Sequence, residues 1–140
     1  MNPSLEILAG QHHEVRRLTR ALSTSAEECL NLQDAERIRS LLSELSGLLM
    51  VHFAMEDNHV YPKLLAHRDA STREIASRFK SEIGDLSDRF KVFRRLWSDP
   101  AKLLDERAAF RVECGKMFQL LNQRMTIEDR QLYPLLAAPR

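Results

Sequence analysis

The sequence predicts an all-α protein, an antiparallel four-helix bundle with up-down-up-down topology. Apolar residues recur every three or four positions along four long stretches, and no β-branched run alternates with polar residues as in a strand. Only four glycines and five prolines occur among the 140 residues, so little interrupts the helical pattern. Long helices with short connections favour an antiparallel bundle, here a single domain that spans residues 1–140.

Helix one is expected to begin at Pro3, with Asn2 as its N-cap, because proline suits the first position of a helix. It is expected to end before the polar residues 23–25. Its inward-facing residues share helical spacing and an apolar character: Leu5, Leu8, Val15, Leu18 and Leu22.

Helix two is expected to run from about Asp34 to about His67. Pro62 lies inside this pattern, so we expect a kink or a break near Tyr61. The apolar stripe of this helix is longer than that of helix one: Ile38, Leu41, Leu42, Leu45, Leu48, Leu49, Phe53 and Val60.

Helices three and four each follow a capping signal. Ser71 and Glu74 have the spacing of a capping box, which predicts the start of helix three. Asp99 followed by Pro100 predicts the start of helix four, which is expected to continue to Pro134. The stripe of helix three is Ile75, Phe79, Ile83, Leu86, Phe90, Phe93 and Leu96, and that of helix four is Leu103, Leu104, Phe110, Met117, Leu120, Leu121, Ile127 and Leu132.

One segment of the sequence occurs twice, as residues 52–62 and again as residues 124–134. Both copies contain a Glu-Asp pair and a Tyr-Pro pair at the same spacing. The first residue differs, because His52 is replaced by Arg124 in the second copy. The repeat predicts two helical hairpins related by a pseudo-twofold axis, with different chemistry at one equivalent position.

His52 and Glu56 have the spacing of metal ligands on a helix. Residues i and i+4 lie about 40° apart around the helix axis, so both side chains can reach one ion. His12 has apolar neighbours at helical spacing and is the histidine of helix one expected to point inward. Two alternatives need no metal: a buried hydrogen bond between His52 and Glu56, and an ion pair between Arg124 and Glu128.

Two further histidines are candidates for the same site. His13 follows His12 directly and is expected at the rim or on the surface. His59 lies seven residues after His52, on nearly the same side of the helix, so it is an additional candidate ligand. The alternative for His59 is a hydrogen bond to Gln131 or Tyr133.

These motifs resemble the hemerythrin-like (HHE cation-binding) domain family, four-helix bundles that hold a non-haem di-iron centre. The strongest match is His52-Phe53-x-x-Glu56-Asp57-x-x-Val60-Tyr61-Pro62, and Glu128-Asp129-x-x-Leu132-Tyr133-Pro134 resembles the same motif on the last helix. The resemblance implies four metal ligands in this chain: His12, His52, Glu56 and Glu128. The histidines that the family has on helices three and four fall at Ile83 and Arg124.

The resemblance therefore implies a depleted, degenerate site. In the family, helices one and two supply the terminal histidines of one iron, helices three and four those of the other, and two carboxylates bridge. This chain keeps the first half, so we expect one iron rather than two, with zinc, manganese or a metal-free protein as alternatives. Arg124 is expected to replace the charge of the second ion by pairing with Glu56, Glu128 or both.

These observations predict a non-enzymatic metal-binding domain that binds or senses a small diatomic ligand, oxygen or nitric oxide, or that handles iron. The alternative is a metal-free regulatory module with a protein partner. No Ser-His-Asp set or glycine-rich phosphate loop suggests catalysis. A net charge of +1 gives no reason to expect nucleic acid, and no apolar run appears long enough for a membrane. The start of the chain shows no signal peptide, so a cytoplasmic location is expected.

Overall fold

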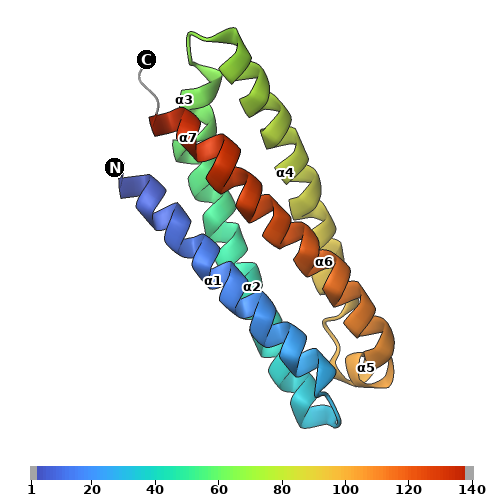
Figure 1. Ribbon diagram of the computed structural model, residues 1–140. Coiled ribbons are helices and arrows are strands. Elements are labelled where there is room, and N and C mark those ends of the chain that lie inside the picture. Colours follow the sequence, from blue (N-terminus) through green and yellow to red (C-terminus); the bar gives the residue numbers. More distant parts are fainter. Residues whose placement is uncertain (1–2, 138–140) are drawn as a thin grey trace.

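The computed structural model describes residues 3–137, and in this range four long helices run antiparallel to one another (Figure 1). They are α1 (Pro3–Glu27), α2 (Leu32–His59), α4 (Ala70–Leu96) and α6 (Arg107–Ile127). Shorter segments extend them: α3 (Tyr61–Leu65), α5 (Pro100–Asp105), the π-helix η1 (Glu128–Leu132) and α7 (Tyr133–Ala137). The described residues contain no strand, and the predicted all-α bundle is confirmed.

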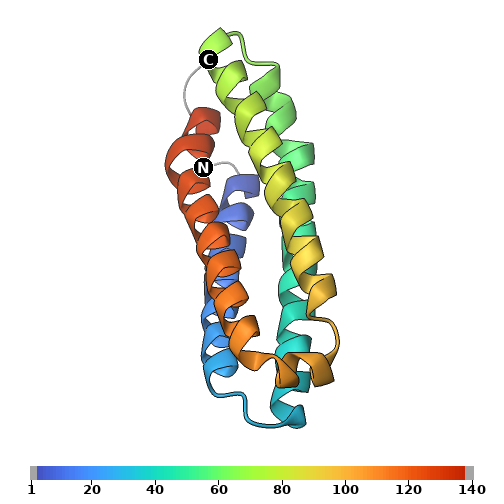
Figure 2. The same cartoon turned by 90° about the vertical axis from the view of Figure 1, so that its right-hand side faces the viewer.

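The connections lie at the two ends of the bundle. The α1–α2 connection and α5 lie at one end, and the α3–α4 connection lies at the other, together with α7 (Figure 2). α1 packs against α2 and α6, and α6 also packs against α4. The predicted up-down-up-down order therefore holds, with short helices added at the turns.

Side-chain caps precede α2, α4 and α5, and the starts of the first two differ from those predicted. Asn31 caps α2 by accepting from the backbone N–H of Asp34 at 2.9 Å, so the helix begins earlier than expected. The capping box was wrong for α4, because Asp69 accepts from the N–H of Ser71 at 3.1 Å instead. Asp99 caps α5 as predicted. The predicted cap of helix one, Asn2, lies outside the described residues.

The helix ends also differ from the expectations. α1 continues through residues 23–25 to Glu27, because the extra turn buries Ala26 in the core. Helix four is not continuous from Pro100: the chain forms α5, turns at Glu106 and only then begins α6. This short helix covers the end of the bundle by burying Leu103 completely.

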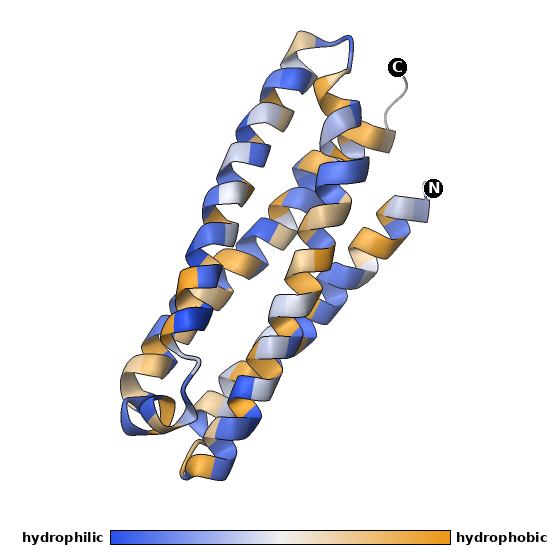
Figure 3. Ribbon diagram, turned by 180° about the vertical axis from the view of Figure 1, so that it is seen from behind, coloured by the Kyte–Doolittle hydropathy of each residue, from blue (hydrophilic) through white to orange (hydrophobic). Residues whose placement is uncertain are grey.

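The core forms along the inward faces of the four long helices. Hydrophobic and hydrophilic residues alternate along each helix, as expected where one face packs inward (Figure 3). Most of the predicted stripe residues are buried, and several others, such as Ile75, are half-buried and pack against the core. Leu96 is 50% exposed, so it was assigned wrongly to the core.

The stretch Leu32–Leu65 is, among the described residues, long and apolar enough to cross a membrane by length and composition alone. The expectation from the sequence concerned uninterrupted apolar runs, whereas this stretch qualifies by mean hydropathy although polar residues interrupt it. Core helices of soluble proteins pass the same test, so a single such helix is weak evidence for a span. This one carries His52 and Glu56, which are both buried inside the bundle.

Candidate metal centre

Four side chains singled out by the sequence meet inside the bundle. Ligand atoms of His12 on α1, His52 and Glu56 on α2, and Glu128 on η1 all lie within 4.8 Å of one another. None of the four residues is more than 1% exposed. Burying two imidazoles and two carboxylates costs free energy unless they bind protons, hydrogen-bond donors or a cation. Imidazole nitrogen and carboxylate oxygen are common ligands of iron, zinc and manganese.

Hydrogen bonds on their far sides orient both imidazoles. The Nδ1 of His12 donates to Oδ1 of Asp129 at 2.8 Å, since an ionised carboxylate can only accept. The Nδ1 of His52 lies 2.8 Å from Oε1 of Gln11, whose amide nitrogen contacts the sulfur of Met55. Because each Nδ1 is engaged on the far side, each Nε2 faces the centre of the group, where it binds either a proton or a metal ion. Metal-binding histidines commonly have this arrangement.

The atoms at the centre crowd one another. The Nε2 atoms of His12 and His52 are 3.1 Å apart, and Oε1 of Glu128 lies 2.9 Å from the first and 3.2 Å from the second. Lone pairs at these separations repel unless a proton or a cation lies between them. The centre of the group therefore favours positive charge.

The pKa values of the group follow from the same contacts. Burial lowers the pKa of His52, but hydrogen bonds to Glu128 and Glu56 outweigh this effect and raise it to about 9. Burial and the charge of Glu128 raise the pKa of Glu56. Burial also opposes ionisation of Glu128, yet hydrogen bonds from His12 and His52 bring the pKa of Glu128 well below its usual range. Without a metal, His52 and Glu56 therefore retain protons at neutral pH.

Glu56 provides a direct test of whether a cation fits here. Its Oε1 is buried and has no hydrogen-bond partner among the described residues. A carboxylate oxygen in this position is costly when ionised and unpaired. It is satisfied as a ligand of a cation, so the donor set fits a bound metal ion.

Arg124 points into the bundle and lies beside this group. Its side chain is 6% exposed, and its Nε lies 3.4 Å from Oε2 of Glu128. Its two terminal nitrogens donate to Oε2 of Glu82 at 3.1 Å and to the carbonyl oxygen of Phe79 at 2.7 Å. Among the described residues its ion pairs are thus with Glu128 and Glu82, while the expected alternative pair with Glu56 does not form. Ile83 holds the other position at which the family has a metal-binding histidine, and it is also buried.

The structure does not bring His13 or His59 into the group, because both side chains are exposed. Seven residues return to nearly the same side of a helix but lie about 10 Å further along its axis. His59 is also the last residue of α2, before the break at Val60. The interpretation of His59 as an additional ligand is therefore not supported by its position.

Tyr133 was not among the predicted ligands, yet its hydroxyl lies at the group. The hydroxyl donates to Oε2 of Glu56 at 2.8 Å and lies 3.0 Å from Nε2 of His12 and 3.2 Å from Oε1 of Glu128. Burial and both carboxylates raise the pKa of Tyr133, so without a cation it is a neutral donor. The repeated Tyr-Pro pair marked this residue, but its orientation depends on the π-helix before it.

Three other neighbours were also missed. Gln11 and Asp129 orient the imidazoles, and Arg16 donates to Oδ2 of Asp129 at 3.0 Å. Asp129 belongs to the repeated Glu-Asp pair, which was the one available signal. Gln11 and Arg16 flank the His-His pair of helix one without any distinctive motif.

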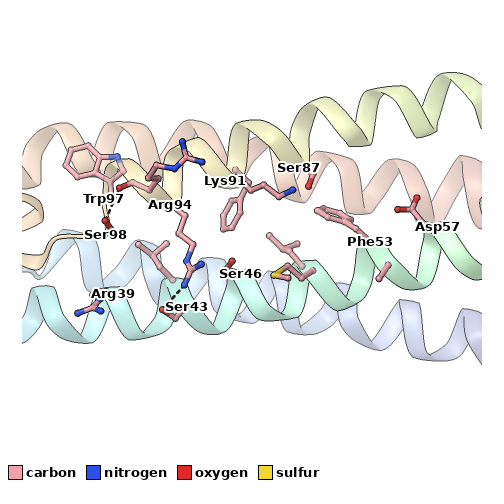
Figure 4. A pocket seen from close by; sticks show the side chains of 16 residues that line it. Arg39, Ser43, Ser46, Phe53, Asp57, Ser87, Lys91, Arg94, Trp97 and Ser98 are labelled. Atoms are coloured by element: carbon pink, nitrogen blue, oxygen red, sulfur yellow. Dashed lines mark hydrogen bonds between the residues drawn. The ribbon is translucent and has the colours of Figure 1, made fainter.

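A groove with a volume of about 720 Å³ runs between α2 and α4 on the surface (Figure 4). Its apolar residues include Phe53, Phe90 and Trp97, and Arg94 spans it to reach the hydroxyl of Ser43 at 3.3 Å. None of the four candidate metal ligands lines this groove. It is therefore separate from the buried group.

Fold and site together define a helical bundle with a buried histidine and carboxylate group that suits a cation. The family model of the hemerythrin HHE cation binding domain matches residues 4–136. The chain therefore belongs to the hemerythrin HHE cation-binding family, whose domains generally bind rather than catalyse. Neither a curated protein nor a solved structure matches the chain significantly.

Proposed function

We propose that this protein is a non-enzymatic domain that binds one iron ion through His12, His52, Glu56 and Glu128. The observation that carries the proposal is the buried group itself, in which four ligand atoms lie within 4.8 Å. The hydrogen bonds at both Nδ1 atoms and the unpaired Oε1 of Glu56 support it. Family membership supports cation binding in general, and iron is the family's typical metal.

One ion fits this chain better than two. A second ion in the family's manner would need histidines where Ile83 and Arg124 stand. An isoleucine offers no ligand atom, and the permanent cation of Arg124 already pairs with Oε2 of Glu128. Electrostatic repulsion between this guanidinium and a metal ion opposes occupation of the second half.

A single iron ion favours nitric oxide sensing or iron handling over oxygen transport. Reversible oxygen binding in the family's manner uses two electrons, one from each of two irons. When bound, one iron offers a coordination position to a small diatomic ligand. Cys29 and Cys114 are both free, in agreement with the cytoplasmic location that we propose.

Elemental analysis of the purified, untagged protein tests this proposal. We expect about one metal ion per chain, iron rather than zinc or manganese, as a two-histidine, two-carboxylate set allows. His52→Ala should abolish retention of the ion, while His59→Ala, a matched change on the exposed side of the same helix, should not. Metal that is retained equally by the wild type and His52→Ala would contradict the proposed site.

A second candidate function is a metal-free regulatory or protein-interaction module. The observation that favours it is the ion pair of Arg124 with Glu128, which supplies a fixed positive charge to the buried carboxylates. A stably folded wild-type protein that contains no metal, even after anaerobic loading with ferrous iron, would favour this candidate. Nitric oxide binding by the iron-loaded protein, followed in the visible spectrum, would favour the first.

A further inference from the structure

The hydroxyl of Tyr133 occupies a place inside the donor group rather than at its edge. It lies 2.8 Å from Oε2 of Glu56, 3.0 Å from Nε2 of His12 and 3.2 Å from Oε1 of Glu128. Adjacent ligand atoms around one ion lie about 3 Å apart when each is about 2.1 Å from the metal. The Tyr133 hydroxyl has three separations of this size, to atoms on α1, α2 and η1. These match the separations between a further ligand and its neighbours around one ion.

The π-helix explains how Tyr133 reaches this place. In η1 the backbone N–H of Tyr133 bonds to the carbonyl of Glu128, five residues earlier. This pairing brings residues i and i+5 to nearly the same side of the helix. In an α-helix their side chains would point in widely different directions. The ring also stacks on the imidazole of His12, with centroids 5.3 Å apart. Both features fix the direction of the hydroxyl.

Tyr61 holds the equivalent position in the other copy of the repeat and behaves differently. Its hydroxyl is buried but has no hydrogen-bond partner among the described residues. The break at Val60, in place of a π-helix, precedes it. The two tyrosines therefore share a sequence motif, while only Tyr133 contacts the candidate ligands.

We propose that Tyr133 is a fifth ligand of the bound ion and gives the site a preference for ferric iron. On binding, the phenol O–H bond breaks, the proton leaves to solvent, and the oxygen donates the retained electron pair to the ion. Three oxygen donors beside two imidazoles suit a hard, highly charged cation better than zinc. This inference rests on the proposed metal site and adds one ligand to it.

A phenolate bound to ferric iron gives an intense visible charge-transfer band, which imidazole and carboxylate ligands do not give. We would load the full-length protein with ferric iron, remove the excess by desalting, and record visible and resonance Raman spectra. The wild type and Tyr61→Phe should show the band, whereas Tyr133→Phe should retain iron without it. Tyr61→Phe is the matched control, because it removes the same group from the equivalent position.

Labelling makes the test independent of the folding of Tyr133→Phe. The chain has two tyrosines, so in Tyr61→Phe grown on ring-deuterated tyrosine every phenolate vibration belongs to Tyr133. A deuterium shift of the enhanced ring modes would support the ligand. Iron retained by the wild type without a phenolate band would overturn this inference and leave the metal site standing. No iron retained by the wild type would overturn both.

Discussion

The two copies of the repeated segment place the same Glu-Asp and Tyr-Pro pairs in one bundle, yet their surroundings differ in charge. In the first copy, His52 points to the shared centre, and its acidic neighbours raise its pKa, so it keeps a proton at neutral pH. In the second, Arg124 turns to Glu128, Glu82 and the carbonyl of Phe79, and carries its charge permanently. The side of the site around His52 can exchange protons for a metal ion. The side around Arg124 cannot, because the charge of the guanidinium is permanent.

The backbone differs between the copies as well. α2 ends at His59, and Tyr61 starts a new short helix after the break at Val60. The second copy continues through η1 without a break, which brings Tyr133 to Glu56 and His12. Identical motifs can therefore present different side chains to the same centre, because one extra residue in a helical turn rotates everything after it.

The largest expected effect comes from converting the second half into a copy of the first. In the double variant Ile83→His and Arg124→His, both replaced side chains are buried, and the permanent cation is removed. We expect the metal content to rise from about one ion per chain to about two, because imidazole nitrogens are ligands for iron and zinc. Elemental analysis measures this gain.

The single variant Arg124→His is the control for this conversion. It lacks the histidine at position 83, so the second metal position remains incomplete. Its metal content should stay at about one ion per chain. A folded double variant that takes up no second ion would show that the two halves differ in more than these two residues.

A smaller effect is expected from removing only the cation. Arg124→Met should lower the free energy of unfolding of the metal-free protein by about 3–5 kcal/mol, because Glu128 loses one buried partner and the carbonyl of Phe79 loses its donor. Urea denaturation in the presence of a chelator measures it. Arg130→Met, an exposed change six residues later, should stay within about 0.5 kcal/mol. Equal stability of the two variants would mean that Arg124 does not hold the second half together.

The pH dependence of the stability of the metal-free protein should come from His52 and Glu56 alone, both in the first copy of the repeat. The pKa of His52 is about 9 in the folded protein against 6.5 for the free side chain, so its contribution is complete below pH 6.5 and is lost as the pH rises through about 9. The raised pKa of Glu56 acts in the same direction. The metal-free protein should lose on the order of 1 kcal/mol of stability per pH unit across this window.

Denaturant titrations at a series of pH values test this slope. His52→Gln should reduce the slope, since glutamine has no proton to lose in this range and only the contribution of Glu56 remains. A wild-type protein whose stability does not change from pH 6.5 to pH 9 would contradict the protonated His52. With metal bound the trend should reverse, because the ion displaces these protons and binds more tightly as the pH rises.

Helical periodicity was enough to predict the fold, the inward position of His12 and the burial of His52 and Glu56. The break near Tyr61 followed from Pro62, yet the equivalent Pro134 produced no break. In the second copy the π-helix η1 precedes the proline, and the helical path continues into α7. Sequence patterns therefore predicted that the two copies differ in chemistry at His52 and Arg124, but not that their backbones differ before the tyrosine.

The site was predicted as far as its ligands lie on regular helices. Gln11 and Asp129 contact the imidazoles through interactions between elements far apart in sequence, such as α1 and η1, and a single sequence does not show these pairings. Asp69, in place of Ser71, caps α4 because either residue can accept from the first N–H groups.

The smallest expected difference compares the two tyrosines directly. Tyr133→Phe leaves Oε2 of Glu56 without its 2.8 Å donor, so the metal-free protein should lose about 1–3 kcal/mol of stability. Tyr61→Phe removes a buried hydroxyl that has no partner among the described residues, and its effect should be under about 0.5 kcal/mol or slightly stabilising. Paired urea titrations with a chelator would resolve this difference. Equal losses in both variants would mean that the π-helix confers no special contact on Tyr133.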